Sequence, residues 1–434
     1  MSVAPARRAA YGVIRRVFEQ DAFADRALHG AVAELGARDR ALAMALAYGT
    51  VQRRRTLDHL LAGFVSRPLE RLEPAVLAAL RLGLFQLVYL GGVTDYAAVN
   101  ESVELVKHES RGGGQLVNAV LRRAAREAPA RLAQLDDRTP QRAAVLYSVP
   151  DWLAEMWWRE LGPQAARALL QSVNTPAESA LRVNLLRATP EEVLAALPAG
   201  SAARPAPPWE RQPGLPELPD VLVLDGAFDA FGSELFLGGA VMPQARGSAV
   251  VARTLAPLPG ERVLDLCAAP GGKTTHLAAL MGGEGELIAV EAHPGRSRAL
   301  EETCQRMGAG FVSVRCADAR GFSDPRPFHR VLVDPPCSGL GTLQARPDLR
   351  WQPSRGQIEQ LVAKQAELLR AGAGALGPGG TLVYSVCTVS RREGDGVIDA
   401  FLEEVPGFTD EGRWQLLPSL ERTDGFFIAR LRRA

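Results

Sequence analysis

Hydrophobic residues recur at helical spacing over the first 130 residues, and the pattern then changes. Apolar positions three and four residues apart predict helices over 9–18, 39–51, 56–64, 74–90, 97–107 and 118–126. The breaks fall at Arg67-Pro68, Gly91-Gly92 and Gly112-Gly113-Gly114, where proline and glycine interrupt helices. The pattern predicts an all-helical domain, to which we assign residues 1–137.

The helical pattern relaxes near Asp136 and gives way to a short mixed segment. A helix is expected after Pro150, a strand over 180–184 and a second helix over 190–197. The stretch 202–219 is rich in proline and predicts a surface loop. We assign residues 138–233 to a small α/β segment.

From about residue 249 the pattern alternates between strand, loop and helix. The expected strands are 262–266, 287–290, 311–315, 331–333, 381–385 and 426–431, with helices over 273–280, 295–307, 354–376 and 393–404. Such alternation predicts a mostly parallel sheet covered on both faces. In these sheets ligands bind beyond the carboxyl ends of the strands. We assign this α/β domain to residues 234–434.

Composition narrows the class of protein. The 434 residues are 47% hydrophobic and 23% charged, which fits two or three globular domains. There is no apolar run of membrane-spanning length and no secretory start, so a cytoplasmic, non-membrane protein is expected. Five cysteines without a CxxC pair and six histidines argue against a disulfide framework or a metal site. A monomer is expected.

Charge is unevenly distributed although the formal net charge is only +1. Residues 1–135 hold 19 basic and 13 acidic side chains, a net +6, and the remainder carries −5. A basic domain joined to an acidic one fits a domain that binds nucleic acid. The arginine runs 53–55 and 122–123 are candidate phosphate contacts, and an ordinary solvated helix surface explains them equally well.

A glycine-rich turn follows the first strand of the third domain and predicts a nucleoside cofactor. The turn consists of Cys267, Ala268, Ala269, Pro270, Gly271, Gly272 and Lys273. Its glycines allow close backbone approach, and the following helix offers free N–H donors. Glu291 ends the second strand, where an acid can bind ribose hydroxyls, and Asp318 follows the third, beside an expected adenine edge. Each acid taken alone is also a plausible helix cap.

Two cysteines about fifty residues apart each follow an apolar run. Cys337 lies in Asp334-Pro335-Pro336-Cys337, and Cys387 follows the strand 381–385. Carbon 5 of a pyrimidine becomes nucleophilic once a thiolate adds to carbon 6. Asp334 is the nearest group for a proton or hydrogen bond at N3 of the base. Two thiols could divide the roles of nucleophile and resolving base, whereas Cys267, Cys304 and Cys316 are better read as small apolar residues.

At these motifs the sequence resembles the RNA 5-methylcytosine methyltransferases that use S-adenosylmethionine. The resemblance implies a Rossmann-like class I methyltransferase domain. It also implies that Cys387 is the nucleophile and that Cys337 assists product release. Cofactor contacts are implied from Cys267 through Lys273 and from Glu291, Asp318 and Asp334.

The resemblance extends over nearly the whole chain. The segments Ala97-Ala98-Val99-Asn100-Glu101 and Val117-Asn118-Ala119-Val120-Leu121 are similar to a NusB-like RNA-binding domain. That domain is fused to the bacterial enzyme acting on a cytidine of small-subunit (16S) ribosomal RNA, which implies this RNA as the partner. The chain departs from the family pattern at Pro335, Glu291, Gln244-Ala245-Arg246 and Gln344-Ala345.

Two other functions are compatible with parts of the sequence. Asp334-Pro335-Pro336 could begin an amino-group methyltransferase motif, but that motif requires an aromatic residue where Cys337 stands. A non-catalytic RNA-binding factor would account for the helical domain and would leave the cofactor turn and both thiols without a role. Binding of S-adenosylmethionine separates this last reading from the two enzymes.

Overall fold

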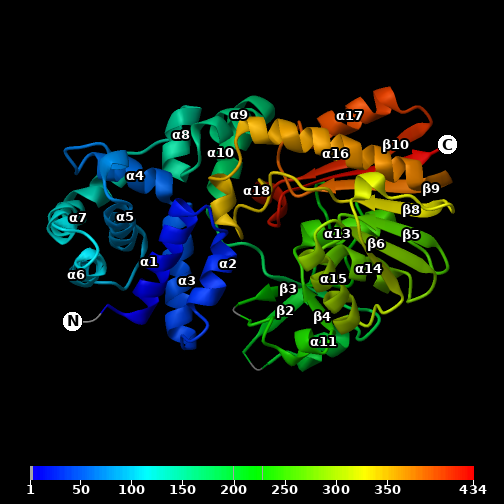
Figure 1. Cartoon of the computed structure of the whole chain (residues 1–434), viewed down its shortest axis with the longest axis horizontal. Helices are drawn as coiled ribbons and strands as arrows, with labels where there is room; N and C mark the ends of the chain where they lie inside the picture. Colours follow the sequence, from blue (N-terminus) through cyan, green and yellow to red (C-terminus); the bar gives the residue numbers. More distant parts are fainter. Residues whose placement is uncertain (1–2, 199, 227) are drawn as a thin grey trace. The chain divides into compact units, whose positions relative to one another are not determined.

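Two compact units make up the protein, seen in a computed structural model that describes residues 3–198, 200–226 and 228–434 (Figure 1). Unit 1 contains Met1–Thr175 and Leu343–Pro353, and unit 2 contains Pro176–Thr342 and Ser354–Ala434. The short segment Leu343–Pro353 therefore belongs to unit 1, although both of its flanks lie in unit 2. No helix in the described ranges combines the length and apolar surface that a membrane span requires.

Unit 1 is all-helical, which confirms the predicted class. Its helices are α1 (Pro5–Glu19), α2 (Ala24–Ala31), α3 (Ala37–Gln52), α4 (Arg54–Ala62), α5 (Pro74–Tyr89), α6 (Asp95–Val106), α7 (Gly113–Leu132), α8 (Pro140–Tyr147), α9 (Asp151–Leu161) and α10 (Pro163–Ser172), with short 3₁₀ turns η1 (Leu69–Arg71) and η3 (Pro347–Arg350). One apolar core joins α1 to α7. The sequence analysis missed α2, because Leu28 is its only large apolar residue.

The segment Leu343–Pro353 is fixed to unit 1 by buried hydrogen bonds. Arg350 is fully buried and donates to the carbonyl oxygens of Ser148 and Val173, each at 3.1 Å. The Trp351 indole N–H donates to the Val51 carbonyl oxygen at 2.8 Å. Since a buried guanidinium is costly unless its donors are satisfied, these bonds define where the segment lies.

Unit 2 begins with a small antiparallel sheet that confirms the predicted α/β segment. Its strands are β1 (Ala180–Val183), β2 (Ala202–Pro205), β3 (Val221–Asp225) and β4 (Val241–Pro243), in the order β2-β3-β1-β4, with helices α11 (Pro190–Ala196) and α12 (Glu234–Leu237). The prediction that 202–219 is entirely loop was wrong at β2. This edge strand is mostly exposed and ends at a proline, so it lacks the apolar alternation of a buried strand.

A seven-stranded mixed sheet forms the rest of unit 2. The strands are β5 (Arg262–Leu266), β6 (Glu286–Glu291), β7 (Val312–Cys316), β8 (Phe328–Val333), β9 (Leu376–Val386), β10 (Phe408–Leu416) and β11 (Phe426–Arg433), in the order β10-β11-β9-β8-β5-β6-β7. Strands β5 to β9 pair in parallel, and β11 is antiparallel to both β9 and β10. The sequence analysis missed β10, whose half-exposed and charged residues do not alternate cleanly.

Helices cover this sheet and bury an apolar core on each face. They are α13 (Arg246–Leu255), α14 (Gly272–Leu280), α15 (Pro294–Arg306), α16 (Arg355–Ala375) and α17 (Asp395–Glu404), followed by the short α18 (Pro418–Glu421) and accompanied by the turn η2 (Ala319–Gly321). This architecture confirms the predicted Rossmann-like domain. The domain boundaries proposed from the sequence, after residues 137 and 233, stay a prediction.

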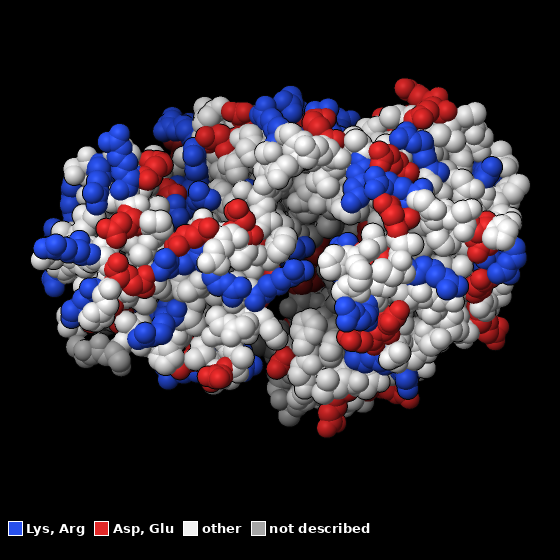
Figure 2. Space-filling model, in the orientation of Figure 1, with Lys and Arg blue, Asp and Glu red and all other residues white. Residues whose placement is uncertain are grey.

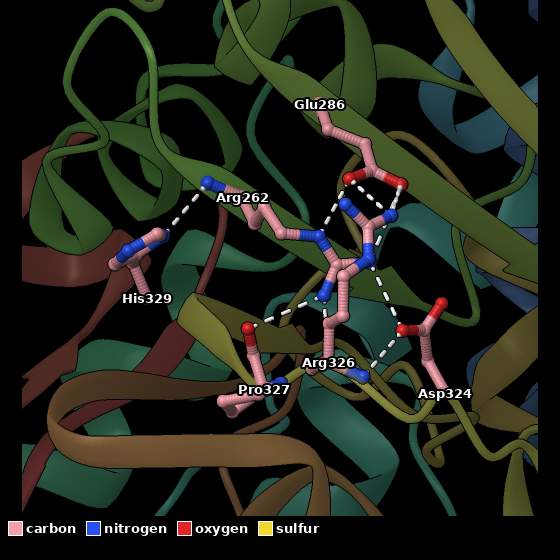
Figure 3. Close-up of polar contacts among 6 residues, drawn as sticks. All are labelled: Arg262, Glu286, Asp324, Arg326, Pro327 and His329. Carbon is pink, nitrogen blue, oxygen red and sulfur yellow. Dashed lines mark hydrogen bonds and ion pairs between the residues drawn. The ribbon is translucent and has the colours of Figure 1, made fainter.

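An ion-pair cluster joins the amino ends of three strands (Figure 3). Arg262 at the start of β5 donates to Glu286 at the start of β6 at 2.5 Å and pairs with Asp324 at 3.1 Å. Its backbone N–H donates to Nδ1 of His329 in β8 at 2.9 Å. Arg326 adds a second, more exposed bond to Glu286 at 2.9 Å. The cluster lies at the edge of the sheet opposite the carboxyl ends.

Replacing Arg262 by methionine should lower the free energy of unfolding by about 2 kcal/mol, because charged hydrogen bonds with little solvent access are lost. Urea unfolding followed by circular dichroism measures this. Arg326→Met is the matched control: its side chain is 63% exposed, so its loss should stay below about 1 kcal/mol. Equal losses in the two variants would show that burial of Arg262 contributes nothing.

Candidate active site

The groups singled out from the sequence lie in unit 2 at the carboxyl ends of neighbouring parallel strands. Strand β5 leads into the glycine-rich turn, β6 ends at Glu291, β8 leads to Asp334 and β9 leads to Cys387. Leu266 of β5 is in register with Val290 of β6 and with Val333 of β8. The parallel topology thus brings residues up to 120 positions apart in the chain to one edge.

The turn between β5 and α14 uses left-handed backbone at two of its residues. Cys267 has a φ of 64° and Gly271 a φ of 102°, both in the left-handed region. A Cβ atom at Gly271 would lie 2.9 Å from Cδ1 of Leu300, so a larger residue would be strained and crowded. Ala268, Ala269 and Pro270 complete the turn, and α14 begins at Gly272. The first N–H groups of a helix have no partner within the helix and suit a polar ligand.

A buried carboxylate at the end of β5 is hydrogen-bonded to the first turn of α14. Asp265 of β5 is fully buried, and its Oδ2 accepts a hydrogen bond from Thr274 Oγ1 of α14 at 2.7 Å. Burial raises the pKa of the Asp265 carboxyl to about 7 despite the Thr274 hydrogen bond. This contact ties the start of α14 to the end of β5.

The two other acids predicted to bind the cofactor have different surroundings. Glu291 is 2% exposed, and its Oε1 accepts from the His293 N–H at 2.8 Å and from Arg296 at 2.7 Å. Asp318 has a half-exposed carboxyl that caps η2 and pairs with Arg320 at 2.6 Å. The hydrogen bond from Arg320 lowers the pKa of Asp318 to about 2. Asp318 is therefore a helix cap, as the alternative reading of the sequence allowed.

Asp334 lies between the cofactor turn and the second thiol. Its Oδ2 accepts from Lys273 Nζ at 2.8 Å, and its Oδ1 accepts from Ser385 Oγ at 2.8 Å. Burial works against the Lys273 ammonium, but attraction to Asp334 outweighs it and raises the pKa of Lys273. The lysine of the turn, one of only three in the chain, is thus held beside the β8 acid.

Cys337 and Cys387 face each other with their Sγ atoms 3.3 Å apart, and either thiol can donate to the other. The hydrogen bond from Cys337 lowers the pKa of Cys387, helped by Lys273 and opposed by burial. The same hydrogen bond, together with burial, raises the pKa of Cys337. The pKa of Cys387 is therefore shifted below that of Cys337, which favours Cys387 as the more reactive sulfur of the pair.

The other three cysteines are not part of this pair. Burial raises the pKa of Cys267 and of Cys304 to about 12, so both remain neutral thiols. Cys316 is exposed at the end of β7. Within the described ranges, no cluster of three histidine, cysteine or acidic side chains is arranged to hold a metal ion.

Two residues at this edge were missed by the sequence analysis. Ser385 is two positions before Cys387 on the same face of β9, so strand alternation could have revealed it. Arg182 in β1 is fully buried and donates to Thr275 Oγ1 at 2.9 Å and to the Gly272 carbonyl oxygen at 3.3 Å, at the start of α14. An arginine within an apolar strand was the only signal for it.

The arginines of unit 1 divide into two groups. Basic and acidic side chains are interspersed on the face of the molecule seen in Figure 2. Arg53 lies over the Tyr89 ring at 4.7 Å, and Arg55 pairs with Asp151 at 2.7 Å, so this run serves the packing of unit 1. Arg122 and Arg126 of α7 are exposed and line a groove of about 290 Å³.

The chain matches known families in three places. Residues 252–432 match the family described as 16S rRNA methyltransferase RsmB/F. Residues 4–126 match the NusB family, and residues 149–211 match the Methyltr_RsmF/B-like, ferredoxin-like domain. The three matches follow the order of the helical, small α/β and large α/β parts of the fold.

Individual relatives are similar over nearly the full length. The probable ribosomal RNA small subunit methyltransferase B of Bacillus subtilis is 34% identical, over 92% of both proteins. Ribosomal RNA small subunit methyltransferase B of Thermus thermophilus is 36% identical, over 91% of this chain and 89% of the relative. The crystal structure of PH0851 is 27% identical with a TM-score of 0.83, covering 99% of each chain.

Proposed function

Since the chain belongs to the 16S rRNA methyltransferase RsmB/F family, we propose that it methylates carbon 5 of a cytidine in small-subunit ribosomal RNA, with S-adenosylmethionine as the methyl donor. The observation that carries this proposal is the pair of thiols 3.3 Å apart at the carboxyl edge of the sheet. A methyltransferase acting on an exocyclic nitrogen forms no covalent intermediate and has no use for two adjacent thiols.

The residues around the β5–α14 turn fit a nucleoside cofactor. Helix α14 begins at Gly272 and Lys273, whose backbone N–H groups have no partner within the helix and suit a polar ligand. Glu291 has a nearly buried carboxylate at the next strand end, where it can accept from ribose hydroxyls. Asp318 is proposed to lie at the adenine edge, and its carboxylate also pairs with Arg320. When bound, S-adenosylmethionine supplies an electrophilic methyl group.

Cys387 is the residue that activates the base. Its thiolate adds to carbon 6 of the cytosine, which forms a sulfur–carbon bond and moves the electron pair of the 5,6 double bond toward carbon 5 and N3. The Cys337 hydrogen bond and the Lys273 ammonium favour the ionised form of Cys387. Both contacts therefore favour addition from the thiolate form of Cys387.

We assign the proton transfers at N3 and at carbon 5 of the base to Asp334 and Cys337. The Lys273–Asp334 pair is a source of a proton or hydrogen bond for N3 as electron density shifts there. After carbon 5 carries its methyl group, the proton on that carbon must leave as the bond from carbon 6 to the Cys387 sulfur breaks. We assign both proton transfers to Cys337, which gives its own proton to the departing Cys387 sulfur and takes the proton from carbon 5, so that both thiols are regenerated.

Substrate recognition is assigned to the helical unit. Arg122 and Arg126 are exposed on α7, near Tyr96 of α6, whose side chain is 64% exposed. Such groups suit backbone phosphates and an unpaired base. The target cytidine has to be unpaired or flipped out of a helix to reach two half-buried cysteines. The enzyme is proposed to act in the cytoplasm as a monomer.

The position of the methyl group tests this function. Purified protein is incubated with protein-free small-subunit ribosomal RNA and S-adenosylmethionine carrying a labelled methyl group, and the RNA is digested to nucleosides. Label in 5-methylcytidine is the expected result. Label in a nucleoside methylated on the exocyclic nitrogen would overturn the proposal, and so would absence of label from both this RNA and partly assembled subunits.

A further inference from the structure

A buried glutamate outside the described catalytic groups contacts both cysteine loops. Glu393 follows β9 in the loop before α17 and is fully buried. Its Oε1 accepts from the Ser338 N–H at 2.8 Å, and its Oε2 accepts from the Ser338 hydroxyl at 2.5 Å. Oε2 also accepts from the Thr388 hydroxyl at 3.2 Å. Ser338 follows Cys337 directly, and Thr388 follows Cys387 directly.

Further bonds fix this carboxylate. Gln365 of α16 donates from Nε2 to Glu393 Oε1 at 3.1 Å and to the Pro336 carbonyl oxygen at 3.0 Å. The Tyr384 hydroxyl donates to the Glu393 carbonyl oxygen at 2.7 Å. One acid thus receives four hydrogen bonds, from a helix and from both loops. A buried carboxylate satisfied in this way has one defined position.

We propose that Glu393 is a positioning residue that holds the two thiols against each other by accepting hydrogen bonds from the residue after each cysteine. This inference rests on the proposed function for its catalytic meaning, but the juxtaposition itself is independent of substrate. Without the carboxylate, Ser338 and Thr388 would keep their 2.8 Å mutual contact, and nothing would fix both to α16.

The charge of Glu393 also acts on the Cys337 sulfur. The carboxylate contributes to raising the pKa of Cys337, after the Cys387 hydrogen bond and burial. The other charged or titratable groups that act on the pair are Lys273, Asp334, Tyr384 and Asp424. Lys273 favours ionisation of Cys387 and Asp334 opposes it, whereas Glu393 opposes ionisation of Cys337.

Three variants test this positioning role of Glu393, which we call the Glu393 clamp. Glu393→Ala removes the acceptors, and misplacement of the nucleophile should lower the methylation rate about 100-fold. Glu393→Gln keeps the size and one acceptor but removes the charge, so it should retain much more activity. Glu403→Gln, which removes a charge from the exposed surface of α17, is the matched control and should behave as wild type.

The decisive readout is alkylation of each thiol by iodoacetamide, followed by peptide mass spectrometry across pH without RNA. In wild type Cys387 should react first. In Glu393→Gln the initial rate at Cys337 should rise about tenfold, equivalent to one pKa unit. Thermal unfolding identifies any variant that does not fold; if Glu393→Ala does not, Glu393→Gln carries the test.

Unchanged rates at both thiols in folded Glu393→Gln, together with wild-type methylation in folded Glu393→Ala, would overturn the clamp. Since alkylation needs neither RNA nor cofactor, it separates failure of the clamp from failure of the proposed function. If methylation proved to occur on nitrogen while the alkylation pattern changed as expected, the positioning role of Glu393 would be supported and the proposed function would be rejected.

Discussion

Replacing Cys387 by alanine should lower the rate of RNA methylation by about 10⁴-fold or more, because it removes the proposed nucleophile that adds to carbon 6. The same variant should form no protein–RNA adduct that survives denaturation. Cys337→Ala should instead accumulate such an adduct, since addition and methylation proceed while release is slowed. Denaturing electrophoresis with labelled RNA measures the adduct, and nucleoside analysis measures the product.

The adduct and product measurements distinguish the role of Cys387 from that of Cys337, and a control variant distinguishes both from an unrelated cysteine. Cys316→Ala is the control, because this exposed cysteine at the end of β7 should be dispensable. Methylation by Cys387→Ala at more than about one-hundredth of the wild-type rate would remove the nucleophile assignment. An adduct trapped in Cys387→Ala rather than in Cys337→Ala would reverse the two roles.

The Asp334→Asn variant should lower the maximal rate by about 10² to 10³-fold, the range expected for losing a positioned proton donor or acceptor. The asparagine keeps the shape but cannot accept and return a proton between Lys273 and N3. The pH dependence should change in a characteristic direction. Because the Asp334 charge raises the pKa of Cys387, its removal lowers that pKa. The rising limb of the pH–rate profile should then move to lower pH while the plateau falls.

A lower plateau together with a rising limb at lower pH distinguishes Asp334 from a residue with only a structural role. A variant that only disturbed the packing of the site would lower the methylation rate without moving the rising limb of the pH–rate profile to lower pH. Asp399→Asn is the matched control, since Asp399 has a 60% exposed side chain in α17 and pairs with Arg413. A plateau within threefold of wild type for Asp334→Asn would contradict the proposed role at N3.

Prediction from sequence was accurate where the spacing of apolar residues determines the secondary structure. The strand expected over 262–266 is β5, and α14 begins and ends close to the helix expected over 273–280. The elements that were not predicted are β2, β3, β4, β10, α2, α8, α10, α12, α13 and α18. In the exposed strands β2 and β10 and the alanine-rich helix α2, neighbours supplied by the tertiary fold, rather than apolar periodicity, determine the conformation.

By itself the sequence determined the class of each domain and predicted the β5–α14 turn and the two cysteines with Asp334 as the reactive set. Only the tertiary structure decided how these groups interact. The Lys273–Asp334 pair, the 3.3 Å contact between the thiols and the buried Glu393 each join segments that are distant in the chain. Local periodicity reports which face of an element is buried, whereas contacts between strand ends depend on sheet order and register. For that reason motifs could predict a reactive set, while the contact between the two sulfurs depended on the tertiary structure.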